Sequence, residues 1–144
     1  MTDSVRYKRP ESVLVVVYTG QGDVLLLNRV RPAGFWQSVT GSLEWDEQPM
    51  QAAVRELCEE TGIYSRRLVD CQQQHSFPIL PEWRDRYDPD VIENTEHVFK
   101  LQLDAPLAVQ LNPQEHSQCQ WLPISEAADK VFSWTNRDAI LALL

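Results

Sequence analysis

Three glutamates, Glu56, Glu59 and Glu60, lie close together near the end of the stretch GSLEWDEQPMQAAVRELCEETGI, which covers residues 41–63. On a helix, residues 56 and 60 project in the same direction about one turn apart, and residue 59 lies beside them. Each carboxylate is disfavoured by roughly 0.3–1 kcal/mol near the negative end of the helix dipole. Oxygen ligands without histidine or cysteine suit a hard cation such as Mg²⁺ or Mn²⁺. Helix composition alone favours a solvated acidic surface, and a metal site is the alternative.

The helix that positions these carboxylates is predicted to begin at Pro49 and to end before Gly62. Proline suits the first turn of a helix, and glycine suits its C-terminal cap. Arg55 precedes Glu59 by four residues, a spacing at which two side chains can pair on a helix surface. The opposite face of the helix is apolar and predicts burial. It is formed by Met50, Ala53, Val54 and Leu57.

The remaining segments predict a mixed β-sheet covered by helices. Apolar or alternating runs predict strands at residues 12–18, 24–30, 35–41, 68–77, 97–103 and 117–123. A glycine-rich turn joins the first two strands into a hairpin. Ser125 is predicted to cap one helix, and Ser133 or Thr135 a last one. Residues 78–95 are rich in proline, charge and aromatic side chains, and they predict a long loop.

Length and charge restrict the class of protein. A chain of 144 residues predicts one domain over residues 1–144, and its formal charge of −8 argues against nucleic acid as a partner. A polyanionic substrate would therefore need a local positive feature, such as a bound divalent cation.

No apolar run reaches the ~18–20 residues that span a bilayer, so no membrane partner is expected. The N-terminus lacks an apolar signal segment, and the three cysteines have no CxxC spacing, which predicts reduced thiols in the cytoplasm.

The residue spacing within the stretch 41–63 resembles the motif of a known protein family. Gly41, Glu47 and the run Arg55–Ile63 match the Nudix box at every defined position, so the chain resembles the Nudix hydrolase family. That resemblance implies an α/β fold, an α/β/α sandwich around a mixed β-sheet. It also implies a loop–helix–loop that binds Mg²⁺, with Mn²⁺ as a substitute, and water attack at phosphorus in a small phosphoanhydride substrate. Bound metal ions would neutralise phosphate charge and orient the water.

The resemblance also implies a role for each matching position. The metal-binding glutamates are Glu56, Glu59 and Glu60, the bracing residues are Arg55 and Glu47, and the turn glycines are Gly41 and Gly62. Glu56, Glu59 and Arg55 form the predicted catalytic set, with Glu59 a candidate general base. In this family a carboxylate from a later loop often completes the metal site, which makes Glu115 a further candidate ligand; the alternative is an exposed loop acid. His116, beside it, is expected at the surface, and a role as ligand or base is the alternative.

Segments outside the box resemble one branch of the family. YKRPESVLVVVY, FWQSVTGS and SWTNRDAI are similar to the Nudix enzymes of folate biosynthesis, which remove pyrophosphate from 7,8-dihydroneopterin triphosphate. Activity on nucleoside triphosphates or dinucleoside polyphosphates is the alternative within the family, and a non-catalytic binding module is the alternative outside catalysis. The resemblance yields candidate substrate contacts, each of which could instead be structural: Lys8, Arg29, Thr40, Phe77, Pro78, Ile79, Leu80 and Ser133.

Overall fold

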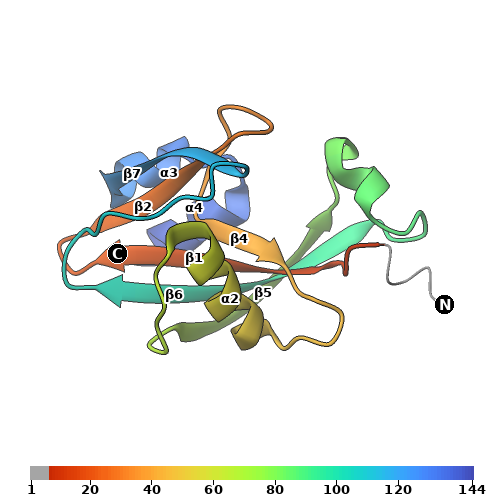
Figure 1. Ribbon diagram of the computed structural model, residues 1–144, viewed down its shortest axis with the longest axis horizontal. Coiled ribbons are helices and arrows are strands. Elements are labelled where there is room, and N and C mark those ends of the chain that lie inside the picture. Colours follow the sequence, from red (N-terminus) through yellow and green to blue (C-terminus); the bar gives the residue numbers. More distant parts are fainter. Residues whose placement is uncertain (1–6) are drawn as a thin grey trace.

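The computed structural model describes residues 7–144, and its centre is strand β1 (Glu11–Thr19). Strand β6 (Glu93–Leu103) runs parallel to β1, and β5 (Val69–Pro78) runs antiparallel to β6. Figure 1 shows these three strands running beside one another through the body of the molecule. Because β1 is paired on both edges and covered on both faces, it must be apolar throughout, which explains the uninterrupted run of residues 13–17.

The other edge of β1 is shared by two strands. Strand β2 (Asp23–Arg29) pairs with β1 at Tyr18, whereas β4 (Val39–Ser42) pairs with residues 12–15. Strand β2 also pairs with β3 (Trp36–Gln37) and, over its whole length, with β7 (His116–Pro123). The sheet therefore forks along β1, with β2, β3 and β7 on one branch and β4 on the other.

Helices cover both faces of this mixed sheet (Figure 1). Helix α2 (Pro49–Thr61) packs on the face that carries Val13 and Val15, while α3 (Ile124–Lys130) and α4 (Trp134–Leu141) pack on the face that carries Leu14 and Val16. Burial of each such aliphatic side chain contributes about 1.5–3 kcal/mol. This arrangement confirms the predicted sandwich with a mixed sheet.

The predicted strand at 35–41 is divided in two by Ser38, which the sequence pattern did not reveal. The Ser38 N–H donates to Asn136 Oδ1 at 2.8 Å, and Asn136 Nδ2 donates to Ser38 Oγ at 2.9 Å. Both residues are 1% exposed, so each bond satisfies a buried polar group that would otherwise cost about 1–3 kcal/mol. These two bonds join the start of α4 to the residue directly before β4, the strand at which the 41–63 stretch begins.

Two further predictions are changed by the structure. Ser125 does not cap α3, because the helix begins one residue earlier, at Ile124, with Pro123 at the cap position and no side-chain hydrogen bond there. The predicted loop at 78–95 contains a 3₁₀ helix, η1 (Pro81–Arg86), and its last residues already belong to β6. Ser133 does cap α4, since its side chain accepts a hydrogen bond from Asn136 N. In residues 7–144, no helix has the length and apolar character needed to cross a membrane.

Candidate active site

Two of the three clustered glutamates, Glu56 and Glu60, enter a shared pocket at the fork of the sheet. Glu60 is 2% exposed, and its Oε1 has no hydrogen-bond partner among the described residues. Burial raises the pKa of Glu60 well above its usual range, and repulsion from Glu56 and Glu115 adds to the rise. Burial also raises the pKa of Glu56. The charged form of both carboxyl groups is therefore disfavoured here, and the pair needs a source of positive charge.

Gly41 permits this arrangement by its lack of a side chain. A Cβ atom at position 41 would overlap the carboxylate of Glu56. At the other end of α2, Gly62 adopts a left-handed conformation with φ of 77°, and its N–H donates to Cys58 O. That conformation favours glycine and ends the helix directly after the glutamates. The structure thus gives a physical reason for each glycine of the motif.

Arg55 holds the loop before α2 against the helix. Its Nε and Nη2 donate to the two carboxylate oxygens of Glu47 at 2.9 and 2.8 Å, and Nη2 also donates to Ser42 O at 3.0 Å. The remaining nitrogen, Nη1, contacts Glu56 at 2.7 Å and Glu59 at 3.3 Å. Hydrogen bonds from Arg55 lower the pKa of Glu47. A planar guanidinium can make this set of contacts, and a lysine ammonium cannot.

Glu59, the third glutamate, lies outside the pocket lining. Its side chain is 54% exposed and pairs with Arg55, as the four-residue spacing predicts. Over residues 7–144, no three histidine, cysteine, aspartate or glutamate side chains are already arranged around a common metal position. Glu56 and Glu60 nevertheless suit a hard divalent cation, because a buried oxygen without a donor and the raised pKa of both carboxyl groups indicate an unmet need for positive charge. Waters and substrate oxygens commonly complete such a site.

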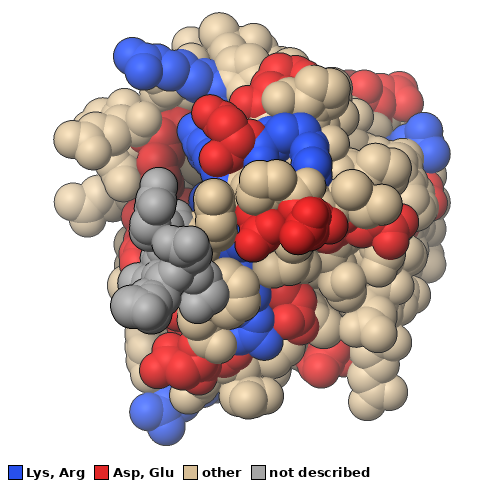
Figure 2. Space-filling model, turned by 90° about the vertical axis from the view of Figure 1, so that its right-hand side faces the viewer, with Lys and Arg blue, Asp and Glu red and all other residues tan. Residues whose placement is uncertain are grey.

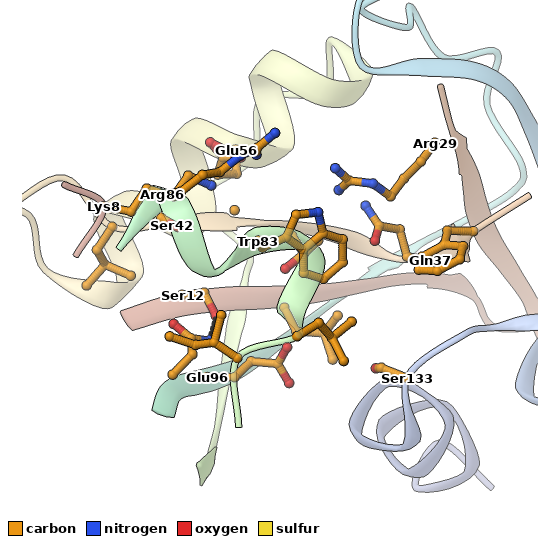
Figure 3. Close-up of a pocket in the computed structure, with 18 of the residues that line it drawn as sticks. Lys8, Ser12, Arg29, Gln37, Ser42, Glu56, Trp83, Arg86, Glu96 and Ser133 are labelled. Atoms are coloured by element: carbon orange, nitrogen blue, oxygen red, sulfur yellow. Dashed lines mark hydrogen bonds between the residues drawn. The ribbon is translucent and has the colours of Figure 1, made fainter. Parts of the chain in front are cut away.

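Three of the basic residues that line the same pocket come from separate segments. Lys8 precedes β1, Arg29 ends β2 and Arg86 ends η1, and all three line the pocket (Figure 3). Loss of hydration, together with repulsion from Arg86 and Arg29, lowers the pKa of Lys8, although part of its side chain is exposed. Figure 2 shows basic and acidic side chains interleaved on one face of this acidic protein. The three cations are therefore a local feature suited to a polyphosphate.

The loop before β7 supplies two more groups. Glu115 lines the pocket with an exposed side chain, and it is close enough to Glu60 to raise that residue's pKa. The surface prediction for His116 is wrong, because the ring is 3% exposed and its Nε2 lies 3.9 Å from Glu60 Oε1. Pairing of His116 with Arg29 at the start of β7 turns the ring inward. Burial and the Arg29 charge lower the pKa of His116 to about 4, so the ring is neutral at pH 7.

An apolar wall lines another part of the same pocket. It includes the predicted segment Phe77–Leu80, together with Trp83 and Trp134. Thr40 and Ser133 also line the pocket, but both hydroxyl groups have partners within the fold. Thr40 Oγ1 donates to Val13 O at 2.8 Å, and Ser133 Oγ accepts from Asn136 N at 3.1 Å. The structure thus brings together every predicted substrate contact, and it gives these two hydroxyls structural partners as well.

Arg86 and Glu96 are among the charged pocket residues that the sequence did not predict. Arg86 lies in the segment 78–95, where no periodicity indicates which charged side chains turn inward. Glu96 is 6% exposed on β6, one residue before the predicted start of that strand at 97. The alternation of β6 would have identified Glu96, since it shares a face with the buried Val98.

Comparison with known proteins adds to this geometry. The family model described as NUDIX domain matches residues 8–143. Dihydroneopterin triphosphate diphosphatase of Escherichia coli K12 is 45% identical over 97% of this chain and 95% of its own length. The protein of that name from Haemophilus influenzae is 37% identical over 94% of this chain and 88% of its own. The solved structure of the E. coli dihydroneopterin triphosphate pyrophosphohydrolase superposes with a TM-score of 0.89 at 42% identity, covering 94% of this chain and 95% of that one.

The contact between Gly41 and Glu56 leads to a stability prediction. Replacing Gly41 with alanine should destabilise the protein by about 1–3 kcal/mol, because the new methyl group displaces the Glu56 side chain. Gly20→Ala is a matched control, since a Cβ there meets only the end of the flexible Gln102 side chain. Thermal unfolding of both variants tests the prediction. Equal melting temperatures for the two variants would contradict it.

Proposed function

The chain belongs to the Nudix hydrolase family, and from this premise we propose that it hydrolyses 7,8-dihydroneopterin triphosphate to dihydroneopterin monophosphate and pyrophosphate. Nudix hydrolases generally need a divalent metal, and the proposal specifies Mg²⁺. It also includes the cytoplasm as the location, which suits the free thiols of Cys58, Cys71 and Cys119. The reaction adds a water oxygen to phosphorus and releases pyrophosphate as the leaving group.

One observation carries the choice of substrate: the likeness to proteins named for this reaction extends over nearly the whole chain rather than the Nudix box alone. The pocket supports the same choice. It combines carboxylates and cations, which suit a triphosphate, with an apolar aromatic wall, which suits a flat ring. A substrate with both parts therefore fits this pocket better than inorganic polyphosphate does.

The proposed roles follow from the contacts of each side chain. Glu56 and Glu60 would hold Mg²⁺, which when bound neutralises phosphate charge and activates water. Arg55 fixes the orientation of Glu56 through their 2.7 Å ion pair, and Glu47 in turn fixes Arg55. Lys8, Arg29 and Arg86 would bind the outer phosphates.

Glu59 remains the candidate general base within the motif. Its exposed carboxylate can accept a proton and pass it to solvent. Glu115 is the candidate additional ligand, because it lines the same pocket from the loop before β7 and its charge raises the pKa of Glu60. Neither role changes the assignment of Glu56 and Glu60, which depends on their burial.

A substrate panel tests the proposed reaction. We expect kcat/KM for dihydroneopterin triphosphate to exceed that for ATP, GTP and diadenosine tetraphosphate by at least about tenfold, with pyrophosphate as a product, because the ring-binding wall contributes only for a fitting ring. The assay follows released pyrophosphate and the monophosphate product with Mg²⁺ present. A tenfold preference for any of the nucleotides would refute the pterin assignment and favour the nucleotide alternative.

A pair of conservative variants tests the assigned carboxylates. Glu56→Gln and Glu60→Gln should each lower kcat by more than about 100-fold, since even outer partners of metal ligands commonly contribute 10–100-fold. Both variants should melt no lower than the wild type, because each removes one member of a buried, mutually repelling pair. Glu126→Gln on the first turn of α3 is the control for an acid outside the pocket. Near-normal turnover in both site variants would remove these residues from the reaction.

A further inference from the structure

The pocket has a second group of carbonyl and carboxylate oxygens, distinct from the Glu56–Glu60 pair. Asn94 and Glu96 line it from strand β6, and each is 6% exposed. Figure 3 shows Glu96 on the opposite side of the pocket from Glu56, with Trp83 between them in this view. The two residues are separated by one position on a strand, so their side chains lie on the same face, about 6–7 Å apart along the strand.

Both residues present acceptors that the described part of the chain leaves unpaired. Asn94 Nδ2 donates to Ser12 Oγ at 2.8 Å, which directs Oδ1 away from that bond, and Oδ1 has no partner. Glu96 Oε1 likewise has no partner. Buried acceptors without donors are uncommon in folded proteins, and each is costly to the fold. A ligand that brings N–H groups into the pocket would satisfy both.

Neighbouring side chains restrict the shape of such a ligand. Phe77 lies directly opposite Asn94 on strand β5, and Ile79 follows it along the pocket wall. Trp83 and Trp134 contribute further aromatic surface. Apolar walls beside a row of hydrogen-bond acceptors suit a planar heterocycle whose edge carries hydrogen-bond donors.

A 2-amino-4-oxopteridine has such an edge. Its ring N–H at position 3 and its 2-amino group are adjacent, parallel donors, and a carboxylate can accept both at once. Adenine presents a ring acceptor beside its amino group, so a carboxylate would be repelled there. Guanine carries the same donor pair as the pterin. A carboxylate acceptor therefore favours rings that carry two adjacent donors along one edge over rings that do not.

Resting on the proposed function, we propose that Glu96 is the specificity-determining residue for the ring: its carboxylate accepts the ring N–H and the 2-amino group of the pterin, and Asn94 Oδ1 is an additional acceptor beside it. The triphosphate then extends across Trp83 toward Glu56, Glu60 and the three cations. The two ends of the pocket have separate tasks, since one recognises the ring and the other positions the bond that breaks.

Substitution of Glu96 by glutamine tests the proposal. Glu96→Gln keeps the shape of the side chain but replaces one acceptor with a donor. The ratio of kcat/KM for dihydroneopterin triphosphate to kcat/KM for ATP should therefore fall about 10–100-fold, mostly through a change in KM. Glu93→Gln, an exposed acid on the same strand, is the matched control. An unchanged ratio in Glu96→Gln would overturn the proposal. Failure of the wild type to hydrolyse the pterin substrate would instead refute the proposed function.

A binding experiment tests the same contact without catalysis and without relying on a variant. Neopterin carries the 2-amino group, and the corresponding lumazine carries an oxygen in its place. The wild type should bind neopterin at least about tenfold more tightly than the lumazine, measured by fluorescence titration without metal, and Glu96→Gln should lose this difference. Equal affinities in the wild type would contradict a carboxylate contact to the 2-amino edge.

The burial of Glu96 leads to a pH-dependent stability that should disappear in the same variant. Burial raises the pKa of Glu96 to about 6, whereas hydrogen bonding from Thr135 on α4 lowers it. The residues that face it on the neighbouring strands are Ser12 on β1 and His75 on β5. Because the folded pKa lies above the unfolded value, the protonated acid is favoured in the fold, and its contribution to stability is lost as the pH rises through about 6.

Thermal unfolding at about pH 5 and about pH 8 measures this effect. The melting temperature of Glu96→Gln relative to the wild type should be higher at the upper pH than at the lower one, since only the wild type must then bury an ionised carboxylate. Glu93→Gln should show no such change. The same difference between Glu96→Gln and wild type at both pH values would show that Glu96 is solvated rather than buried in the pocket.

Discussion

The burial of two adjacent carboxylates at the end of α2 is the constraint on which the rest of the site depends. Glu60 is 2% exposed with an unpartnered oxygen, and burial raises the pKa of both Glu60 and Glu56. Such a pair is unfavourable in an isolated helix, so the surrounding chain must hold it in place. Arg55 does so from the same helix through Glu56 and Glu47, and the close approach of the backbone at Gly41 leaves the space that the Glu56 carboxylate occupies. The helix itself is held by its apolar face on the sheet.

The forked sheet explains how an acidic protein can collect positive charge opposite this pair. Because β2 and β4 diverge along one edge of β1, side chains from distant segments converge in the space between the two branches. Lys8, Arg29 and Arg86 come from three such segments. The same pocket continues to Glu96 on β6. The groups left unpaired there are hydrogen-bond acceptors, whereas the other end of the pocket carries the three cations. A substrate with a polyphosphate at one end and a donor-rich ring at the other matches both regions.

The sequence pattern predicted those elements that are determined by residues close together along the chain. Composition and spacing predict the apolar strand, the helix that begins at Pro49 and ends before Gly62, and the Arg55–Glu59 pair. The structure has all three at those positions. Long-range contacts were not predictable in this way. The bonds of Asn136 divide a predicted strand at Ser38, and strand pairing turns His116 inward although its neighbours are polar. Arg86 and Glu96 joined the site only once the fold brought η1 and β6 to it.

The buried pair at Glu56 and Glu60 is proposed here as a binding site for a divalent cation. The most direct measurement is the melting temperature at neutral pH with chelator and with saturating Mg²⁺ or Mn²⁺, in the absence of substrate. A ligand that binds only the folded state at about 100 times its Kd stabilises by about 2.7 kcal/mol. We expect the melting temperature of the wild type to rise by several degrees, and we expect Glu60→Gln to lose this rise. An equal rise in both proteins would contradict it.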